Sequence, residues 1–588
     1  MDSKTIKNQL QAEWDNLTVD FKTLKDQAQA EWINLTSGNN YWVRVGYGTS
    51  GYAAGAKEIF EYLTEKTKTM NNVKVDLVGS LGLSFAEPLV DVTKEDGVRV
   101  FYNNVDIDIA KKIFNDHIKK NNIVKEFVFG QICSDSEKAL TGFAELDKIE
   151  PLVHTKRIAT KNCGNISPTD INQYIANGGY EGLFKALIQL TPETILEEVK
   201  SSGLRGRGGA AFPTGVKWSF LSGSDSKIKY ILCNCEEGDP GAFNDKGILE
   251  NDPHMLLEGL ILSGYATGAS NGHVFIREGH EIPIETARTA IKDAYEKGFL
   301  GENIMGTGFS FDVEVSLTGD SYVAGEETAL MEAIEGKRAM PRFRPPFPAA
   351  FGLWGKPSNI NNVKTLAYIP SIINNGSSEF KKLGSGNSTG TAIICLSGHI
   401  KRPGMYEIEM GMTISELLKN VGGGSSSKND IKLLQTGGPL GGILGASDFN
   451  IKIDFDEMAK AGAILGSGGI IVGDTSTDVV DLVRNLIAFN QFESCGKCFP
   501  CRLGNTHMLD ILERICMSIP NDKDLDVMAS IGNSMKTGSL CGHGQLGYNP
   551  ISSALKYFKD EFDEAVKVSS QPSPRVSGKM ILPTRTRP

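Results

Sequence analysis

Long apolar runs, an excess of positive charge and early cysteines are all missing from this chain of 588 residues. No stretch of about eighteen or more apolar residues occurs, which argues against a membrane-spanning helix. The formal net charge of −10 argues against a nucleic-acid partner, because such proteins present basic surfaces. The first of ten cysteines is Cys133, and no secretory signal precedes it, so we expect a protein that is not secreted and works in a reducing compartment.

Three of the cysteines, Cys495, Cys498 and Cys501, follow one another at two-residue spacing. A fourth, Cys541, stands in the run Gly-Ser-Leu-Cys-Gly-His-Gly. Three thiolates from one tight turn can reach three corners of a [4Fe–4S] cluster, and a distant segment must supply the last. A structural zinc site usually takes two separated Cys-x-x-Cys pairs, and disulfides fit a triplet poorly. The pattern therefore predicts one [4Fe–4S] cluster and a role in electron transfer.

Residues 1–38 contain an internal repeat, in which Gln11–Thr18 recurs almost unchanged as Gln29–Thr36. The offset of 18 residues is five turns of α-helix, so Trp14 and Trp32 would share one face. The repeat is either a docking helix or a weakly ordered extension, and the sequence does not decide between them.

The composition is that of an ordinary globular protein, with 40% hydrophobic and 22% charged residues. The length predicts roughly four domains, each large enough for its own core. Residues 39–130 show a strand–helix–strand pattern, typical of a small α/β unit of thioredoxin type, and residues 131–194 form a polar connector.

Three further units and a tail follow. Between residues 195 and 385, glycine-rich loops alternate with apolar strands, which predicts an α/β domain with loops shaped for phosphates. Residues 386–468 predict a smaller strand-rich unit. Residues 469–565 carry apolar side chains at helical spacing and predict a helical bundle that holds the cysteines. We expect residues 566–588 to be a disordered tail.

The second strong motif is the glycine-rich run Gly203–Lys217. Glycines let main-chain N–H groups approach a phosphate or a ribityl chain, and Arg205, Arg207 and Lys217 add positive charge. A glycine cluster alone is often only a surface turn. Here further polar and aromatic motifs follow it in order: Asn234 to Asp239, Gly325 to Thr328, Arg342 to Phe347, and Asn361 to Thr365.

These motifs, in this order, resemble the NADH-oxidising flavoprotein subunit of respiratory complex I and its relatives in NAD-linked hydrogenases and formate dehydrogenases. The resemblance covers about residues 155 to 565. It implies a Rossmann-like domain for FMN and NADH, a β-grasp domain of SLBB type, and a helical bundle with the cluster. The fused thioredoxin-like domain makes the architecture most similar to the β subunit of electron-bifurcating iron hydrogenases.

The resemblance assigns two groups of side chains to cofactors, and no side-chain acid or base to catalysis. The flavin site would comprise Gly206, Arg207, Gly208, Gly209, Lys217, Asn234, Glu236, Gly325, Glu326, Asn361, Asn362 and Thr365. The nicotinamide nucleotide would meet Phe212, Phe220, Asp239, Glu327, Arg344 and Phe347. Aromatic faces suit adenine, and a cation suits the pyrophosphate. For Phe212 and Phe220 the alternative is plain core packing.

Departures from the family pattern are informative. Ser50, Ser80 and Ser84 stand where relatives carry [2Fe–2S] cysteines, and serine is a poor iron–sulfur ligand, so we expect the thioredoxin-like domain to have no cluster. Because the tail Gln571–Pro588 contains no cysteine, we also expect this chain to have no ferredoxin domain of the kind that follows the bundle in hydrogenase-type relatives. Within the flavin half, the substituted positions are Glu236 for Asp, Ala324 for Cys, Arg344 for Lys and Lys364 for Glu.

Two functions remain open. The first is an NADH-oxidising electron-input subunit with FMN and one [4Fe–4S] cluster, which passes electrons to a partner. The second is a cluster-bearing scaffold that has lost flavin or nucleotide binding. The resemblance implies two partners, a thioredoxin-like [2Fe–2S] subunit and a further redox subunit of hydrogenase, formate dehydrogenase or complex I kind. It also implies the cytoplasm, or the matrix of a hydrogenosome- or mitochondrion-like organelle.

Overall fold

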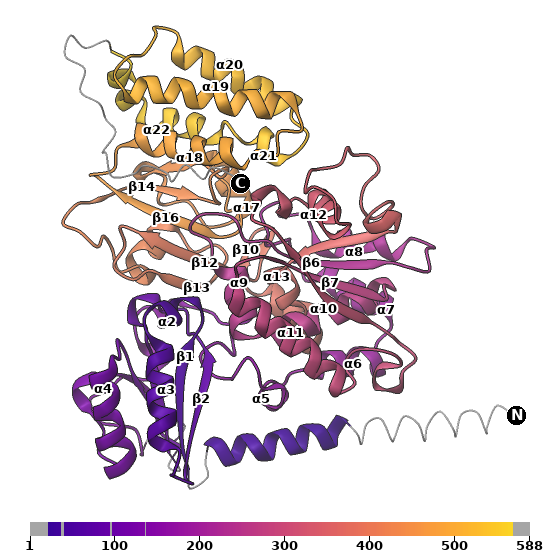
Figure 1. Ribbon diagram of the computed structural model, residues 1–588, viewed down its shortest axis with the longest axis vertical. Helices are drawn as coiled ribbons and strands as arrows, with labels where there is room; N and C mark the ends of the chain where they lie inside the picture. The colour runs from indigo at the N-terminus through magenta and orange to yellow at the C-terminus, as the bar shows by residue number, and fades with distance from the viewer. Residues whose placement is uncertain (1–20, 37–39, 95–96, 134, 136, 568–588) are drawn as a thin grey trace, which may run out of the picture.

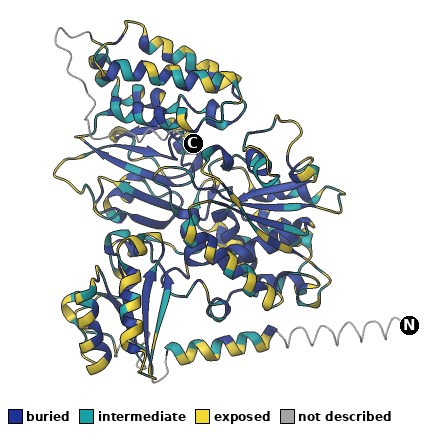
Figure 2. Ribbon diagram, in the orientation of Figure 1, coloured by how far each residue is buried: buried dark blue, intermediate teal, exposed yellow. Residues whose placement is uncertain are grey.

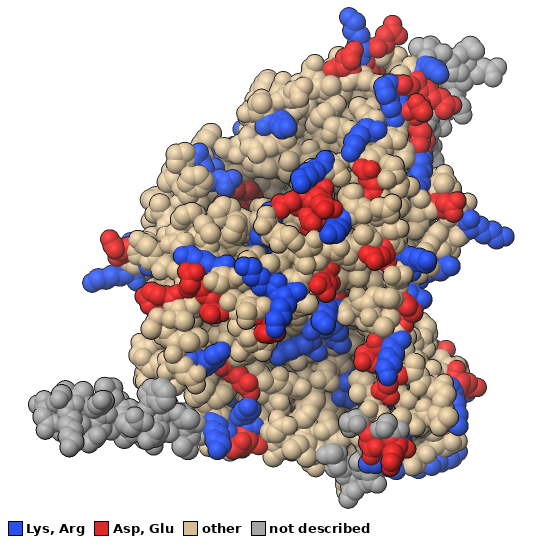
Figure 3. Space-filling view, turned by 180° about the vertical axis from the view of Figure 1, so that it is seen from behind, with Lys and Arg blue, Asp and Glu red and all other residues tan. Residues whose placement is uncertain are grey.

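The computed structural model describes residues 21–36, 40–94, 97–133, 135 and 137–567 (Figure 1). The N-terminal sheet lies at one end of the molecule, two further sheets lie side by side in the middle, and a helical bundle lies at the other end. Acidic and basic side chains are interspersed over the face seen in Figure 3. No helix of the described segments combines the length and apolar character needed to cross a bilayer.

The N-terminal sheet has five strands in the order β2-β1-β3-β4-β5. Its first two strands are parallel and joined by helix α3, and the other neighbours are antiparallel. This is the thioredoxin-like arrangement that the strand–helix–strand pattern predicted. Ala56, Ile59 and Leu63 recur at helical spacing and bury one face of α3. The elements are β1 (Tyr41–Tyr47), α3 (Ala56–Thr67), β2 (Val73–Gly79), β3 (Val90–Thr93), β4 (Arg99–Tyr102), α4 (Ile107–Lys112) and β5 (Val128–Ile132).

The second copy of the repeat lies in a helix over residues 21–36 that packs against the protein. Phe21 stacks on Phe184 with ring centroids 4.7 Å apart, and Trp32 meets the edge of Trp42 at 5.3 Å. This copy is therefore a helix packed on its own chain, whereas the first copy lies outside the described residues. The connector supplies α5 (Ile171–Ala176) and α6 (Glu181–Gln189), and α7 (Pro192–Ser201) begins at its end and runs into the next domain.

The second sheet is fully parallel, in the order β8-β7-β6-β9. Its register sets Asn234, near the end of β6, directly beside Asn362 at the end of β9. Carboxyl ends of parallel strands are where α/β folds collect ligand-binding groups. The strands are β6 (Tyr230–Cys235), β7 (Asn271–Arg277), β8 (Asp312–Thr318) and β9 (Ser358–Asn362). The helices around them are α8 (Thr214–Ser222), α9 (Asn244–Asn251), α10 (Pro253–Thr267), α11 (Glu281–Glu296), α12 (Glu327–Ile334), α13 (Val363–Ala367) and α14 (Ile369–Asn375).

The third sheet is mixed, in the order β13-β12-β16-β14-β15. Most side chains of its central strands are buried, as Figure 2 shows. Helix α17 (Phe455–Ala461) lies beside it and begins with Asp454 as its N-cap, whose carboxylate accepts from two main-chain N–H groups. The strands are β12 (Thr391–Gly398), β13 (Gly404–Glu409), β14 (Ile431–Thr436), β15 (Ile443–Gly445) and β16 (Gly469–Asp474).

The bundle buries apolar side chains that recur at helical spacing, for example Val479, Val483 and Ile487 on its first helix. Burial of each such side chain contributes about 1.5–3 kcal/mol. Its elements are α18 (Val479–Glu493), α19 (Phe499–Cys516), α20 (Asp524–Gly538), the short α21 (Gly542–Gln545) and α22 (Asn549–Ala565).

Candidate functional site

The four cysteines of the triplet-plus-one motif line one pocket at the edge of the bundle. Cys495 and Cys498 lie in the loop between α18 and α19, Cys501 lies in the first turn of α19, and Cys541 immediately precedes α21. The bundle thus brings together thiols that are 40 or more residues apart. Residues of the parallel-sheet domain complete the wall of the pocket, because it is also lined by Val323 and Pro341.

The chemistry of this pocket suits a cluster. Burial raises the pKa of Cys501 to about 12 and that of Cys541 to about 11, so thiolates there require the positive charge of a metal group. His543 Nδ1, in the pocket wall, is buried without a hydrogen-bond partner. The four thiols fit a [4Fe–4S] cluster, because three come from one short segment and the fourth from a distant one.

The glycine-rich loop before α8 is shaped so that side chains would obstruct it. A Cβ on Gly208 would lie 2.8 Å from Asn362 Cβ, and Gly209 has a φ of +120°, which other residues rarely adopt. Gly206 is different, since a Cβ there would meet its nearest neighbour, the Phe212 carbonyl oxygen, only at 3.5 Å. The loop is tied to α13 by the main-chain N–H of Arg207, which donates to Thr365 Oγ1 (2.9 Å). The glycines of this loop, which we call the cradle, thus carry no side chains of their own, as close approach of the main chain to a flavin requires.

The side chain of Arg207 does not supply charge to this cradle, which corrects the expectation from the sequence. Its guanidinium is buried and donates to the carbonyl oxygens of Thr391 (3.1 Å), Thr389 (2.7 Å) and Arg205 (2.9 Å). Arg205 likewise bonds the Ala211 carbonyl and Asp456. Both arginines therefore fasten the loop to the β-grasp unit, and the loop's own glycines and main chain are left to meet a ligand.

The polar groups after β6 gather around the turn before α12. Asn234 Nδ2 donates to the Gly325 carbonyl (2.8 Å), and a Cβ on Gly325 would lie 2.8 Å from Glu236 Oε2. Burial raises the pKa of Glu236 to about 8, although Arg277 at 3.1 Å opposes the shift. The longer Glu side chain at this position is thus accommodated by a cation and by a glycine.

Asn361 and Asn362, at the end of β9, lie beside a buried ion pair. Asn361 bonds Asn359 and Trp218, whereas Asn362 caps α13 and donates to Asp245 Oδ2 (2.7 Å). Lys364, the reversed charge, is 2% exposed and pairs with Asp245 Oδ1 at 2.6 Å. The positive charge of Lys364 is therefore compensated by the carboxylate of Asp245 on α9.

A second cluster of charged side chains surrounds the start of α12. Glu327 receives Lys217 Nζ (3.0 Å) and Arg344 Nη1 (2.7 Å), and Arg344 also reaches Glu326 (3.2 Å). Burial alone would raise the pKa of Glu327, but the two cations outweigh it and lower the pKa. Glu326 accepts two main-chain N–H bonds as the N-cap of α12. Lys217 thus joins the residues assigned to the nucleotide, rather than the glycine loop alone.

The aromatic residues assigned to the nucleotide are exposed. Phe212, Phe220 and Phe347 have 46%, 57% and 60% of their surface exposed, and the rings of Phe212 and Phe220 lie 6.4 Å apart. Core packing, the alternative for Phe212 and Phe220, is therefore wrong. Exposed aromatic rings offer faces on which a planar base can stack.

Tyr322 is a residue that the sequence did not single out. Its hydroxyl donates to Asp239 (2.7 Å), which also receives Ser467 Oγ (2.8 Å), and its ring lies 5.6 Å from that of His543 at the cysteine pocket. Its main-chain N–H donates to Glu493 of α18 (3.1 Å). Tyr322 thus connects the residues assigned to the nucleotide, which we call the nucleotide group, to the helical bundle. The only sequence signal for this role of Tyr322 was its position just before Gly325. Its partners could not be inferred, because they are 83 or more residues away.

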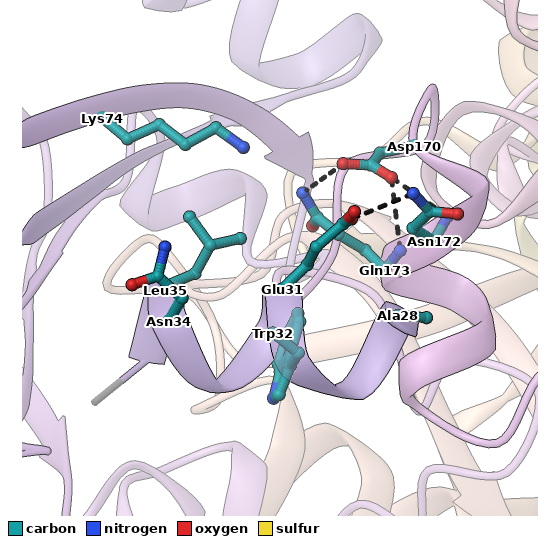
Figure 4. A pocket seen from close by; sticks show the side chains of 9 residues that line it. All are labelled: Ala28, Glu31, Trp32, Asn34, Leu35, Lys74, Asp170, Asn172 and Gln173. Atoms are coloured by element: carbon teal, nitrogen blue, oxygen red, sulfur yellow. Dashed lines mark hydrogen bonds between the residues drawn. The ribbon is translucent and has the colours of Figure 1, made fainter. Parts of the chain in front are cut away.

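A separate pocket lies between the helix over residues 21–36, strand β2 and α5 (Figure 4). Its polar groups bond one another: Asn172 donates to Glu31 (2.9 Å), and Gln173 Nε2 donates to Asp170 (3.0 Å). It contains none of the predicted site residues.

Comparison with known proteins agrees with this geometry. Residues 199–371 match the Nuo51 FMN-binding domain, residues 393–444 the SLBB domain, and residues 481–565 the NADH-ubiquinone oxidoreductase-F iron-sulfur binding region. The NADP-reducing hydrogenase subunit HndC of Solidesulfovibrio fructosivorans is 45% identical over 410 residues, which are 70% of this chain and 83% of that protein. The chain belongs to the family of NADH-oxidising flavoprotein subunits.

Other members of this family show how far the likeness reaches. A subunit of the NADH-quinone oxidoreductase of Escherichia coli (strain K12) is 39% identical over 402 residues, which are 68% of this chain and 90% of that protein. A solved NAD+-reducing [NiFe]-hydrogenase in its H2-reduced state has the same fold, with a TM-score of 0.64 and 24% identity over 90% of this chain and 85% of that chain. As a family member, the chain has FMN and a [4Fe–4S] cluster as cofactors and NADH as substrate.

Proposed function

We propose that this chain is the electron-input subunit of a multi-subunit redox complex. It would oxidise NADH at the cradle and the nucleotide group, and hand electrons through the cysteine pocket to a partner. The observation that carries the proposal is the shared wall between the two sites. Val323 and Pro341 line the cysteine pocket, while Gly325 and Arg344, a few residues away, belong to the groups assigned to flavin and nucleotide.

The chain's own residues would position and separate the reactants. Gly206, Gly208 and Gly209 would let the main chain approach the flavin, with Asn361, Asn362 and Thr365 closing the other side. Phe212, Phe220 and Phe347 would stack on the nucleotide, and Lys217 and Arg344 would meet its phosphates. Flavin supplies the change from two-electron to one-electron transfer. Cys495, Cys498, Cys501 and Cys541 would hold the cluster that receives single electrons.

Two kinds of partner follow from this role. One is a thioredoxin-like [2Fe–2S] subunit, because Ser50, Ser80 and Ser84 leave this chain's own thioredoxin-like domain without thiolates. The other is the redox subunit that uses the electrons, of hydrogenase, formate dehydrogenase or complex I kind. The relative HndC belongs to an NADP-reducing hydrogenase, which makes the hydrogenase assignment the first to test.

The test compares intact protein with a variant that lacks the cluster. Anaerobically purified protein should show a flavin spectrum and oxidise NADH with an artificial acceptor such as ferricyanide. Cys541→Ser should keep both properties, yet lose electron transfer to co-purified partner subunits. NADH oxidation absent from flavin-loaded protein would contradict the proposal. A purified protein with iron but no flavin, even after incubation with FMN, would instead support the scaffold function.

A further inference from the structure

The two loops of the thioredoxin-like domain that carry serine in place of cluster cysteines meet the end of α9 in the parallel-sheet domain. Thr49 N donates to Glu250 Oε2 (2.8 Å), and the Thr49 hydroxyl bonds the other carboxylate oxygen. In the second loop, Ser80 N donates to Asn251 Oδ1 (2.7 Å). The start of the short helix α2 (Thr49–Ala53) and the loop at residues 79–84 are thus held by two consecutive residues of one helix.

The fit is close, and its α9 side and Ser80 are buried, whereas Thr49 itself is exposed. Glu250 and Asn251 are 5% and 2% exposed. A Cβ on Gly79 would lie 2.8 Å from Asn251 Cβ, and one on Gly48 would lie 3.0 Å from Glu250 Oε2. Glycine is therefore needed at Gly79 for the contact to form. A carboxylate at the C-terminal end of a helix faces the negative end of the helix dipole, so Glu250 depends on the Thr49 donors.

The opposite end of the same helix holds the Asn pair of the flavin group. Asp245, in the first turn of α9, accepts from Asn362 Nδ2 (2.7 Å) and Lys364 Nζ (2.6 Å). Glu237, after β6, accepts from the N–H groups of Asp245 and Lys246, both at 2.9 Å. The helix spans eight residues, about 12 Å at the α-helical rise. It is buried along most of its length, so it can shift only as a unit.

We infer that Glu250 is a positioning residue for the flavin site, through which the thioredoxin-like domain fixes α9 and thereby Asp245 and Asn362. The loops that hold a [2Fe–2S] cluster in relatives here set the geometry of a neighbouring cofactor site instead. The inference rests on the proposed function, since it assumes that Asn362 lies at the flavin.

The test removes the Thr49 hydroxyl without changing shape. Thr49→Val should weaken FMN binding by up to roughly 10- to 150-fold, the range that corresponds to losing one hydrogen bond to a charged group. It should also shift the flavin midpoint potential and the flavin visible circular dichroism. Glu250→Gln, which keeps the size of the side chain, should shift the same quantities in the same direction. Thr64→Val, at an exposed position on α3, is the matched control and should change none of them.

A double-mutant cycle separates positioning from general damage. Thr49→Val combined with Asp245→Asn should have less than the summed effect on FMN affinity, because both act through α9. The [4Fe–4S] resonance in the bundle reports whether each variant is still folded there. Wild-type FMN affinity and potential in either folded single variant, or strictly additive effects in the cycle, would overturn the inference. Absence of FMN from the wild-type protein would instead refute the proposed function, so the two failures are distinguishable.

Discussion

Lys364→Met tests how this chain accommodates a lysine where relatives carry a glutamate. The ammonium pairs with Asp245 at 2.6 Å and with Asn244 Oδ1 at 2.7 Å, and both ionic side chains are 5% exposed or less. Methionine keeps the apolar stem of lysine but removes the charge. Asp245 would then be a buried carboxylate with Asn362 as its remaining side-chain donor.

The expected cost follows from the burial of the pair. Breaking a buried ion pair by removing one partner typically destabilises a protein by about 3–5 kcal/mol, because the other charge is left uncompensated. Lys364→Glu should be worse than Lys364→Met, since it places two carboxylates together. The double variant Lys364→Met with Asp245→Asn removes both charges and should recover most of the loss.

Urea unfolding should be monitored by the flavin fluorescence that appears when FMN is released, because this signal reports on the flavin-binding domain. A domain-specific signal is needed because a multidomain protein need not unfold in one step. The predicted order of midpoints is wild type, double variant, Lys364→Met, Lys364→Glu. A Lys364→Met variant within about 1 kcal/mol of wild type would refute the reasoning, because it would place the pair among weak surface ion pairs.

Three further outcomes are expected. Gly208→Val should abolish FMN retention, since a Cβ there already meets a neighbour at 2.8 Å, while Gly319→Ala, with open space around it, should retain FMN in the same assay. Cys498→Ala should lower iron from about four per chain, the content of one [4Fe–4S] cluster, to near zero and leave FMN bound, while Cys516→Ala, outside the pocket, should keep both. Iron that persists in the first variant would mean that other ligands hold it. Replacing Ser50, Ser80 and Ser84 together with cysteine should not restore a [2Fe–2S] resonance, because α9 packs against the segments that carry them. A rhombic signal on reduction would show instead that these segments kept their ligand geometry.

The sequence anticipated features that depend on spacing within short segments. The cysteine triplet, the glycine-rich loop and the helical spacing of the bundle each specify a local geometry, and the structure places them accordingly. The exposed state of Phe212 and Phe220 could not be anticipated, because an aromatic residue near glycines is compatible with a core or a surface.

Contacts between distant segments were beyond the reach of the sequence. Arg207 looked like a phosphate ligand, yet it bonds carbonyl oxygens about 180 residues away. The contact of Thr49 with Glu250 spans 201 residues and carries no motif of its own. Such pairings are set by how whole domains pack, and a single sequence carries no local signal of that packing.

The central claim is that the chain moves electrons from NADH through FMN to a [4Fe–4S] cluster. The most direct measurement is a stepwise anaerobic titration of purified protein with NADH, followed by visible absorption and low-temperature electron paramagnetic resonance. The account predicts loss of flavin absorption and, in the same titration, a reduced-cluster signal that disappears in Cys498→Ala while flavin bleaching persists. Flavin-loaded, iron-loaded protein whose absorption and resonance are unchanged by excess NADH would contradict it.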